Sequence, residues 1–367
     1  MKHLLRISFI ALACYMASLW CFCPCVYKWD FSNLRVPETN RAFCELLRID
    51  NLSNYVKGGG DTIRWRLLFP VIWHDLRLPP MTFLAVPFVF CALFILYSAQ
   101  LVYERTKSYL WALLAGALAA TSSPVIVSSG FLAYFDSALL FCIVAASFLK
   151  RNVFLWVVAA LAPWIDERFI FALPVIAWIQ WNLRADLSPR EFFDRVLAPL
   201  WLGVVIYVII RMVACATGVD TITGGYISHL LKDPHDPVKL LWGWWDSLRW
   251  GWLFVIASIV FSPGLKRLYA LTLIPISLTV LMLSSGDYSR SMGVAFPMVL
   301  LGMVGLFNLL SRRKNLILLV LVTLLALANF ITPAHHSFRA YRIDLLPLWK
   351  QWSDQEIMRG MASQRGW

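Results

Sequence analysis

Long apolar runs recur along the whole chain, with short polar connections between them. A membrane-spanning helix needs about 20 apolar residues, and about eleven runs in this chain are candidates. They cover residues 6–26, 81–103, 109–127, 131–149, 153–165, 169–183, 197–218, 250–264, 268–285, 291–310 and 316–333. The pattern predicts an all-α, polytopic transmembrane bundle of about eleven spans. The short runs between 109 and 183 leave a different pairing open.

The first apolar run, residues 7–22, follows a basic start, residues 1–6. A basic start before an apolar stretch is typical of a signal peptide. However, no convincing small-residue cleavage site follows, and the run is long enough to cross a membrane. We therefore expect an uncleaved first helix that stays part of the bundle.

The basic residues indicate which side of the membrane each connection occupies. If the N-terminus lies inside and the chain alternates, the inside connections carry Lys2, Arg6, Arg105, Lys107, Lys150, Arg151, Arg184, Arg190, Arg195, Lys266, Arg267, Arg312, Arg313 and Lys314. The short outside connections carry only Arg168 and Arg290. Cytoplasmic connections of membrane proteins carry an excess of lysine and arginine. This distribution predicts a cytoplasmic N-terminus and an outside C-terminus.

Three predicted outside segments are longer, at 27–80, 219–249 and 334–367. Long translocated segments tolerate positive charge, so their basic residues agree with the assignment. No soluble domain, internal repeat or low-complexity linker is evident. We therefore expect one integral-membrane helical domain over residues 1–333, with a long first outer loop at 27–80, followed by an outer-face C-terminal tail at 334–367.

The composition excludes an ordinary soluble protein. Hydrophobic residues make up 60% of the chain and charged residues 15%, against about 45–50% and 25% in globular proteins. The net charge of +12 would suggest nucleic-acid binding in a soluble chain. Here the basic residues lie between apolar runs, where they act as topology signals and contacts for lipid headgroups. Nucleic acid is therefore not an expected partner.

Acids and arginines gather on the predicted outer side, and the first such group lies in the loop 27–80. Glycines at 58–60 permit a sharp turn before Asp61, which Arg64 and Arg66 follow. In one interpretation Asp61 is a general base and one of the two arginines holds a phosphate bidentately. In the other, the segment is a flexible loop followed by an interfacial helix with basic anchors.

Two further groups lie at predicted outer ends of helices. Asp136 is either a helix N-cap, a common use of aspartate, or part of a site. Asp166, Glu167 and Arg168 crowd three charges into a short turn. They form either a structural salt bridge or a site in which Arg168 counters a phosphate that the acids orient. Charged groups at membrane depth are costly, so we expect them to face a cavity or a partner.

The last group is the segment 286–290, which contains Asp287, Tyr288 and Arg290. It is either a glycine turn with a capping acid and a snorkelling arginine or a third acid–arginine pair of a site. Because the groups share one predicted face, we expect them to bind a diphosphate or phosphodiester headgroup together with a sugar.

In this arrangement the chain resembles the GT-C superfamily of integral-membrane glycosyltransferases, in particular bacterial members. The resemblance is carried by an N-inside first helix, the Asp-x-x-x-x-Arg-x-x-x-Pro stretch of the first outer loop (Asp61, Arg66, Pro70), and the outer turns 135–137, 166–168 and 287–290. The resemblance covers about residues 1–333 and rests on topology more than on identical residues.

The resemblance implies a sugar donor linked to a polyprenyl phosphate and used on the periplasmic or lumenal side. It implies that an acid of the first outer loop is the catalytic base. Asp61 lies in the matching stretch, and Asp30, close after the first helix, is the rival. Arg290 and Arg168, in later outer turns, would hold the donor phosphate. Many members have adjacent paired acids in this loop and a soluble C-terminal domain, and this chain has neither.

We therefore expect a membrane glycosyltransferase that catalyses hexosyl or related transfer in the cell envelope, at the bacterial inner membrane. The expected site has Asp61 as the base, Arg290, Arg168, Arg64 and Arg66 as donor-phosphate ligands, and Asp136, Asp166, Glu167, Asp287 and Tyr288 as substrate-binding residues. The expected partners are a lipid-linked sugar donor, a glycan or lipid acceptor and membrane lipids. The sequence supports no metal or other cofactor.

Two alternatives stay open at this stage. A transporter or flippase of a lipid-linked or anionic solute would carry charges at mid-membrane and an internal repeat. A surface-glycan polymerase or ligase would share the lipid-diphosphate chemistry and is hard to separate by sequence.

Overall fold

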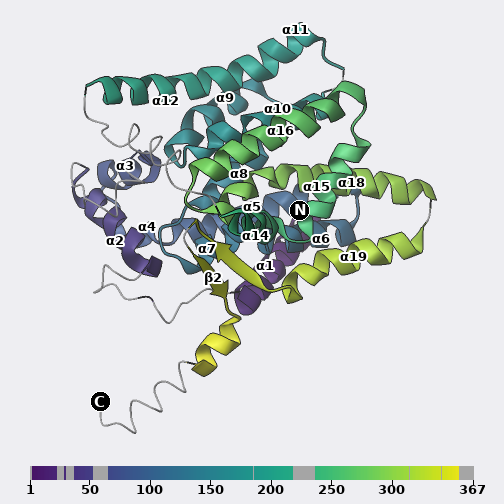
Figure 1. Ribbon diagram of the computed structural model, residues 1–367, viewed down its shortest axis with the longest axis horizontal. Coiled ribbons are helices and arrows are strands. Elements are labelled where there is room, and N and C mark those ends of the chain that lie inside the picture. The colour runs from purple at the N-terminus through teal and green to yellow at the C-terminus, as the bar shows by residue number, and fades with distance from the viewer. Residues whose placement is uncertain are drawn as a thin grey trace.

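The computed structural model describes residues 2–22, 29, 37–52, 65–184, 186–217, 236–313, 315–339 and 341–354. Within these ranges the chain is almost entirely helical, with one two-stranded antiparallel sheet (Figure 1). The prediction of a helical membrane bundle is confirmed in this form. Figure 1 shows α2 and α3 on the left, and the connection from α18 to α19 at the opposite, right-hand end.

The helices follow the apolar runs closely. The first half of the chain contains α1 (Lys2–Phe22), α2 (Pro37–Asp50), α3 (Leu68–Asp75), α4 (Pro80–Phe83), α5 (Val86–Thr106), α6 (Tyr109–Ala120), α7 (Ser123–Gly130), α8 (Asp136–Phe148), α9 (Asn152–Leu161) with a 3-10 turn (Ala162–Trp164), and α10 (Arg168–Leu183). The second half contains α11 (Pro189–Phe192), a π-helical turn (Phe193–Leu197), α12 (Ala198–Ala216), α14 (Pro237–Leu248), α15 (Gly251–Phe261), α16 (Gly264–Ser284), α17 (Tyr288–Met292) with a 3-10 turn (Gly293–Ala295), α18 (Phe296–Arg313) and α19 (Leu316–Ile331). The strands β1 (Ala334–Ser337) and β2 (Arg342–Leu345) follow.

Five helices of the described part are long and apolar enough to cross a membrane. They are Lys2–Phe22, Pro80–Thr106, Pro189–Ala214, Gly264–Ser284 and Tyr288–Arg312. A sixth span results if α6 and α7, which meet at a bend of 58°, are counted as one. Five shorter apolar helices have only 10–17 residues. At 1.5 Å per residue they extend roughly 15–26 Å, less than a hydrocarbon core of about 30 Å. Within the described residues, only five of the about eleven expected spans, or six with the bent pair, are therefore long enough to cross the membrane.

Large apolar side chains cover much of the outer surface of the bundle. Phe9 on α1 is 73% exposed, Ile276 on α16 is 59% exposed and Ile317 on α19 is 82% exposed. In water such a surface would be an aggregation hazard, whereas lipid tails solvate it without penalty. The exposed apolar belt agrees with a multi-pass membrane protein.

Small residues allow the helices of the bundle to pack closely. α15 lies against α18, and a Cβ at Gly302 of α18 would overlap the backbone carbonyl oxygen of Phe254 on α15. Between α9 and α12, a Cβ at Gly203 would lie 2.6 Å from the backbone carbonyl carbon of Ala159. Without a hydrophobic drive in lipid, close backbone approach is a main source of helix–helix affinity.

All three longer outer segments are described in part and contain elements that the apolar pattern did not predict, among them α14 in the segment 219–249. The first outer loop contains α2 and α3, which pack against each other. In the C-terminal tail, β1 and β2 form an antiparallel pair with His336 opposite Ile343, and β1 packs against α7, α14 and α17. His336 is fully buried. A four-residue strand is too short to give a recognisable alternation, so only tertiary contacts define it.

Close packing at Gly302 gives a test of the bundle. We expect Gly302→Val to lower the free energy of unfolding by about 1–3 kcal/mol or more, because the added side chain overlaps Phe254 and forces α15 and α18 apart. Thermal unfolding in detergent measures the change. Gly286→Ala is the control, because its Cβ meets nothing within 4 Å. An unchanged midpoint for Gly302→Val would contradict the packing.

Candidate functional site

A buried aspartate joins three of the predicted acid–arginine groups. Asp136, the first residue of α8, is 2% exposed. Its Oδ1 accepts a hydrogen bond from Nη2 of Arg168 at the start of α10. Its Oδ2 accepts one from Nη1 of Arg290 in α17, at 2.8 Å. One carboxylate therefore ties α8, α10 and α17 together by charge-assisted hydrogen bonds.

These hydrogen bonds are part of a larger acid–arginine network, which consists of Arg66, Asp136, Asp166, Glu167, Arg168, Asp287 and Arg290. On the α10 side the network continues through Asp166. Arg168 donates to its carboxylate from Nε at 2.8 Å and from Nη2 at 2.6 Å. Nη1 of Arg66, from the end of the first outer loop, lies 2.9 Å from Oδ2 of Asp166. Arg66 also donates to Glu167 from Nη2 at 3.1 Å and from Nε at 3.3 Å. The predicted loop arginine thus reaches the turn between α9 and α10.

On the α17 side, the network reaches the β-hairpin. Arg290 pairs with Asp287, and the Oδ1 of Asp287 lies 3.8 Å from Nε2 of His336 in β1. Nδ1 of His336 shares a hydrogen bond of 3.0 Å with Oγ of Ser289. Backbone N–H of Ser337 donates to the same Oγ at 3.1 Å. The hairpin therefore covers the α17 end of the network.

The protonation of these groups follows from burial and neighbouring charge. Burial disfavours the charged carboxylate of Asp166, but the guanidinium groups of Arg168 and Arg66 outweigh it and hold the pKa of Asp166 below its ordinary value. For His336, burial and then the charge of Arg290 lower the pKa well below its ordinary value. At neutral pH Asp166 is therefore ionised and His336 is neutral.

Sequence reasoning missed Arg41 of α2, which lies at the border of the network. Its guanidinium carbon lies 4.5 Å from the ring centroid of Tyr134, and that of Arg290 lies 4.7 Å from the same ring. Arg41 is 8% exposed and its Nε has no hydrogen-bond partner. Burial, and then the charge of Arg66, lower the pKa of Arg41 to about 10. Its spacing from Glu45 and Arg48 on one helix face was the available signal.

A second series of paired polar residues adjoins the β-hairpin, and sequence reasoning also missed it. Asp246 of α14 is 1% exposed, and its Oδ2 accepts a hydrogen bond from Oγ of Ser337. Nε of Arg342 in β2 lies 3.5 Å from the same oxygen. Asp246 therefore connects α14 with both strands, and Ser337 joins it to the network through Ser289.

Most of the predicted site residues that the structure describes lie in one place. The network contains Arg66, Asp136, Asp166, Glu167, Arg168, Asp287 and Arg290. Tyr288 does not join these ion pairs: it is fully buried and packs against Gly243 of α14. Asp61, Asp30 and Arg64 lie outside the described residues, so their roles stay predictions.

Two of the alternative interpretations were wrong. Asp136 is not an N-cap: Phe135 occupies that position, and no side chain caps the helix. Arg290 does not snorkel, because it is only 5% exposed. Asp287 does occupy the N-cap position of α17, but its side chain makes no capping bond and pairs with Arg290 instead. Asp136, Asp287 and Arg290 each pair with an opposite charge. Such a pair stabilises a buried ion better than a helix end or contact with the membrane interface does.

The network is nearly self-neutralising, which determines what it can do chemically. Carboxylates and guanidinium groups alternate along it, and most donors of Arg66 and Arg168 are occupied. Nε of Arg290 and Nε of Arg41 have no partner, and Asp287 keeps 23% of its side chain exposed. An anion that entered the network would contact the guanidinium groups of Arg290 and Arg41, or would replace the Asp287 carboxylate.

Within the described residues, no group of three or more histidine, cysteine, aspartate or glutamate side chains is placed to hold a metal ion. Comparison with the models of known protein families gives no match, and a search of curated proteins finds no significant relative.

We expect the network to depend on Asp136. Asp136→Asn removes the charge that two buried arginines share, so it should lower the free energy of unfolding by about 3–5 kcal/mol. The control is Glu191→Gln, which removes an exposed ion pair with Arg195 at 3.8 Å that contributes about 0–1 kcal/mol. Denaturant or thermal unfolding in detergent compares the two. Equal effects would contradict a central role for Asp136.

Proposed function

We propose that the chain is an integral-membrane glycosyltransferase. It transfers a hexosyl or related unit from a polyprenyl-phosphate-type donor to a glycan or lipid acceptor at the non-cytoplasmic face. The observation that carries this proposal is the convergence of acid and arginine groups from four separated segments on one buried network. Transfer from a phosphate needs cations held in place beside a base, in a site with little water.

In this proposal the arginines act on the leaving group. As the bond between the anomeric carbon and the phosphate oxygen breaks, the electron pair leaves with the lipid phosphate, and its added negative charge needs a preorganised cation. Arg290 is the best placed of the described arginines, because Asp136 holds its Nη1 while its Nε has no partner. Arg41 adds a second buried guanidinium beside the same tyrosine ring.

The neighbouring residues hold these cations in position. Arg168 donates to two carboxylates at once, so its role is to fix Asp136 and Asp166 rather than to contact the donor directly. The acid that takes the proton from the acceptor hydroxyl is Asp61, with Asp30 as the rival. That hydroxyl oxygen then forms the new bond to the anomeric carbon, which inverts its configuration.

The proposed function can be tested with the full-length protein in liposomes that contain a panel of polyprenyl-phosphate sugars. Mass spectrometry measures the polyprenyl phosphate released when an acceptor fraction is added. We expect Asp61→Asn to lower the rate by about 10²–10⁴-fold, the usual effect of losing a general base. Glu191→Gln, in α11 and away from the network, serves as the control and should keep the wild-type rate.

The outcomes of this assay separate the candidates. Loss of activity in Asp30→Asn with full activity in Asp61→Asn would move the base to Asp30. Full activity in both variants would contradict an acid of the first outer loop as the base. No release from any donor by the wild-type protein would contradict the proposed function itself.

We also propose that the N-terminus is cytoplasmic and that the chain crosses the membrane about eleven times, at the bacterial inner membrane. Contacts at the helix ends next to the basic connections support a common side: Nη2 of Arg184 donates to the carbonyl of Lys150 at 2.9 Å, and Oγ of Ser262, at the end of α15, donates to Asn182, near the end of α10, at 3.1 Å. Short helices can cross where the bilayer thins or where flanking residues reach the interface.

Labelling with a membrane-impermeant thiol reagent tests this topology. Asp344 in β2 is exposed and Asp186 lies in an exposed basic connection. We expect the Asp344→Cys variant to be labelled in intact cells, and the Asp186→Cys variant only after the membrane is made permeable. Wild-type protein measures the background from native cysteines. The reverse pattern would contradict a cytoplasmic N-terminus.

A further inference from the structure

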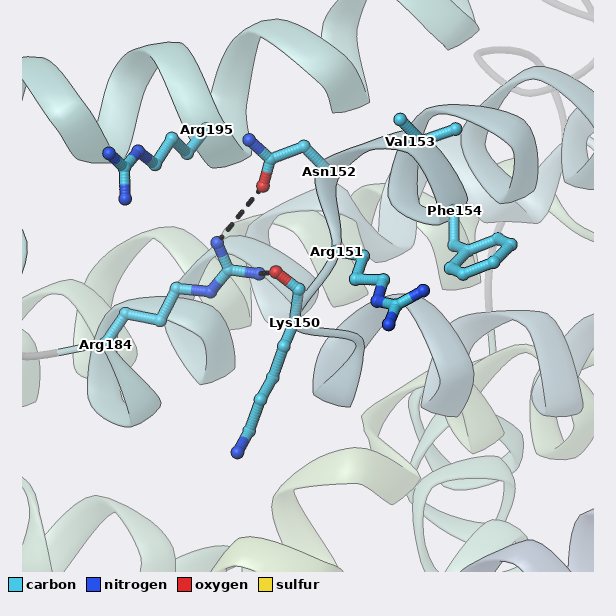
Figure 2. A pocket seen from close by; sticks show the side chains of 7 residues that line it. All are labelled: Lys150, Arg151, Asn152, Val153, Phe154, Arg184 and Arg195. Atoms are coloured by element: carbon cyan, nitrogen blue, oxygen red, sulfur yellow. Dashed lines mark hydrogen bonds between the residues drawn. The ribbon is translucent and has the colours of Figure 1, made fainter.

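A cavity lies among the basic connections, away from the acid–arginine network. Its volume is about 610 Å³, and it is lined by residues 150–154, Arg184 and Arg195 (Figure 2). These residues come from the connection between α8 and α9, the first turn of α9, the end of α10, and the π-helical turn before α12. Elements far apart in the sequence therefore build one wall of cationic groups.

The cations of this cavity differ from ordinary positive-inside residues, because one of them is held in place. Nη2 of Arg184 donates to the backbone carbonyls of Leu149 at 2.8 Å and Lys150 at 2.9 Å, while Nη1 reaches Oδ1 of Asn152 at 3.5 Å. Figure 2 shows the Arg184 guanidinium group directly below the Asn152 amide, and the Arg195 guanidinium group to the left of both. The result is one preorganised cation, Arg184, beside an amide, with Arg195 as a more exposed second cation of the same cavity.

None of the described residues that line the cavity carries a carboxylate. Arg195 forms an ion pair of 3.8 Å with Glu191, and both side chains are about half exposed. Burial, and then the charge of Arg195, lower the pKa of Arg184, as expected for like charges held close together. An anion bound between the two guanidinium groups would relieve this repulsion.

The surroundings of the cavity indicate an amphiphilic ligand. Val153 is 70% exposed and Phe154 is 50% exposed, and both line the cavity. Farther along the same apolar surface, Trp156 on α9 and Trp201 on α12 are also exposed. The cavity therefore lies where the lipid-facing apolar belt meets the cationic connection. Its volume is that of a small-molecule site, larger than an inorganic phosphate needs.

We propose that this cavity binds the phosphate-bearing headgroup of an anionic membrane lipid. Arg184 and Arg195 contact the phosphate oxygens, since planar guanidinium groups match phosphate geometry. Arg151 lies toward the Phe154 end of the cavity (Figure 2), where the acyl chains continue along α9. Basic pockets between transmembrane helices bind such headgroups on the cytoplasmic side. This function is separate from sugar transfer at the network and does not depend on it.

Native mass spectrometry of the full-length protein tests the proposal. Phosphatidylglycerol is titrated against phosphatidylcholine of the same chain length. We expect preferential binding of phosphatidylglycerol, and a loss of about tenfold or more in affinity for Arg195→Gln, because a hydrogen bond to a charged group is removed. Among the described residues, the long ion pair with Glu191 is the polar contact of the Arg195 side chain, so this variant should stay folded. Arg184→Gln should lose at least as much.

The control is Arg312→Gln, which removes an exposed cation at the end of α18, outside the cavity. It should keep the wild-type affinity for phosphatidylglycerol. An equal loss in Arg312→Gln would show a general surface attraction and overturn the site. Unchanged affinity in Arg195→Gln, with a normal unfolding midpoint, would overturn it as well. Displacement of the lipid by inorganic phosphate at equal concentration would show a site for the free anion instead of a lipid.

Discussion

The carboxylate of Asp136 is the constraint on which the arrangement of the outer segments depends. It is almost fully buried and contacts two arginines, from α10 and α17, through separate oxygens. Because a poorly paired buried charge is far more costly than a well-paired one, moving either arginine away would take one of the two partners from a buried carboxylate. The start of α8 therefore determines where the turns before α10 and α17 lie.

The elements around this network reinforce it from outside the bundle. The first outer loop contributes Arg66, which neutralises the turn before α10. The β-hairpin places a neutral His336 beside Asp287. With these covers in place, the charges lie in a medium of low dielectric constant, where each interaction is stronger. A ligand phosphate bound here must replace a carboxylate or use the unpartnered nitrogen of Arg290.

The two ends of the bundle have opposite chemical character. The network end alternates acids and arginines and is nearly neutral, whereas the charged residues that line the cavity at Arg184 and Arg195 are, among the described residues, all cations. A network whose charges already balance is stable without a ligand, and a ligand anion binds there by replacing one of the carboxylates. A cavity of like charges is stabilised by any anion that enters it. The first arrangement suits a reaction centre, and the second suits a resident lipid headgroup.

The sequence by itself determined the class of fold and predicted which acids and arginines lie close together. Apolar runs locate helices because lipid excludes unpaired backbone groups, and each predicted run does contain a helix. The same alternation put Asp136, Arg168 and Arg290 on one predicted face, where they meet. Tertiary structure alone decided the helix lengths and the formation of the β-hairpin. It also decided that Asp136 is a shared counter-ion rather than a cap, and that Arg41 lies at the border of the network. These features depend on partners far away in the chain, and local patterns carry no information about which distant charge a buried ion will find.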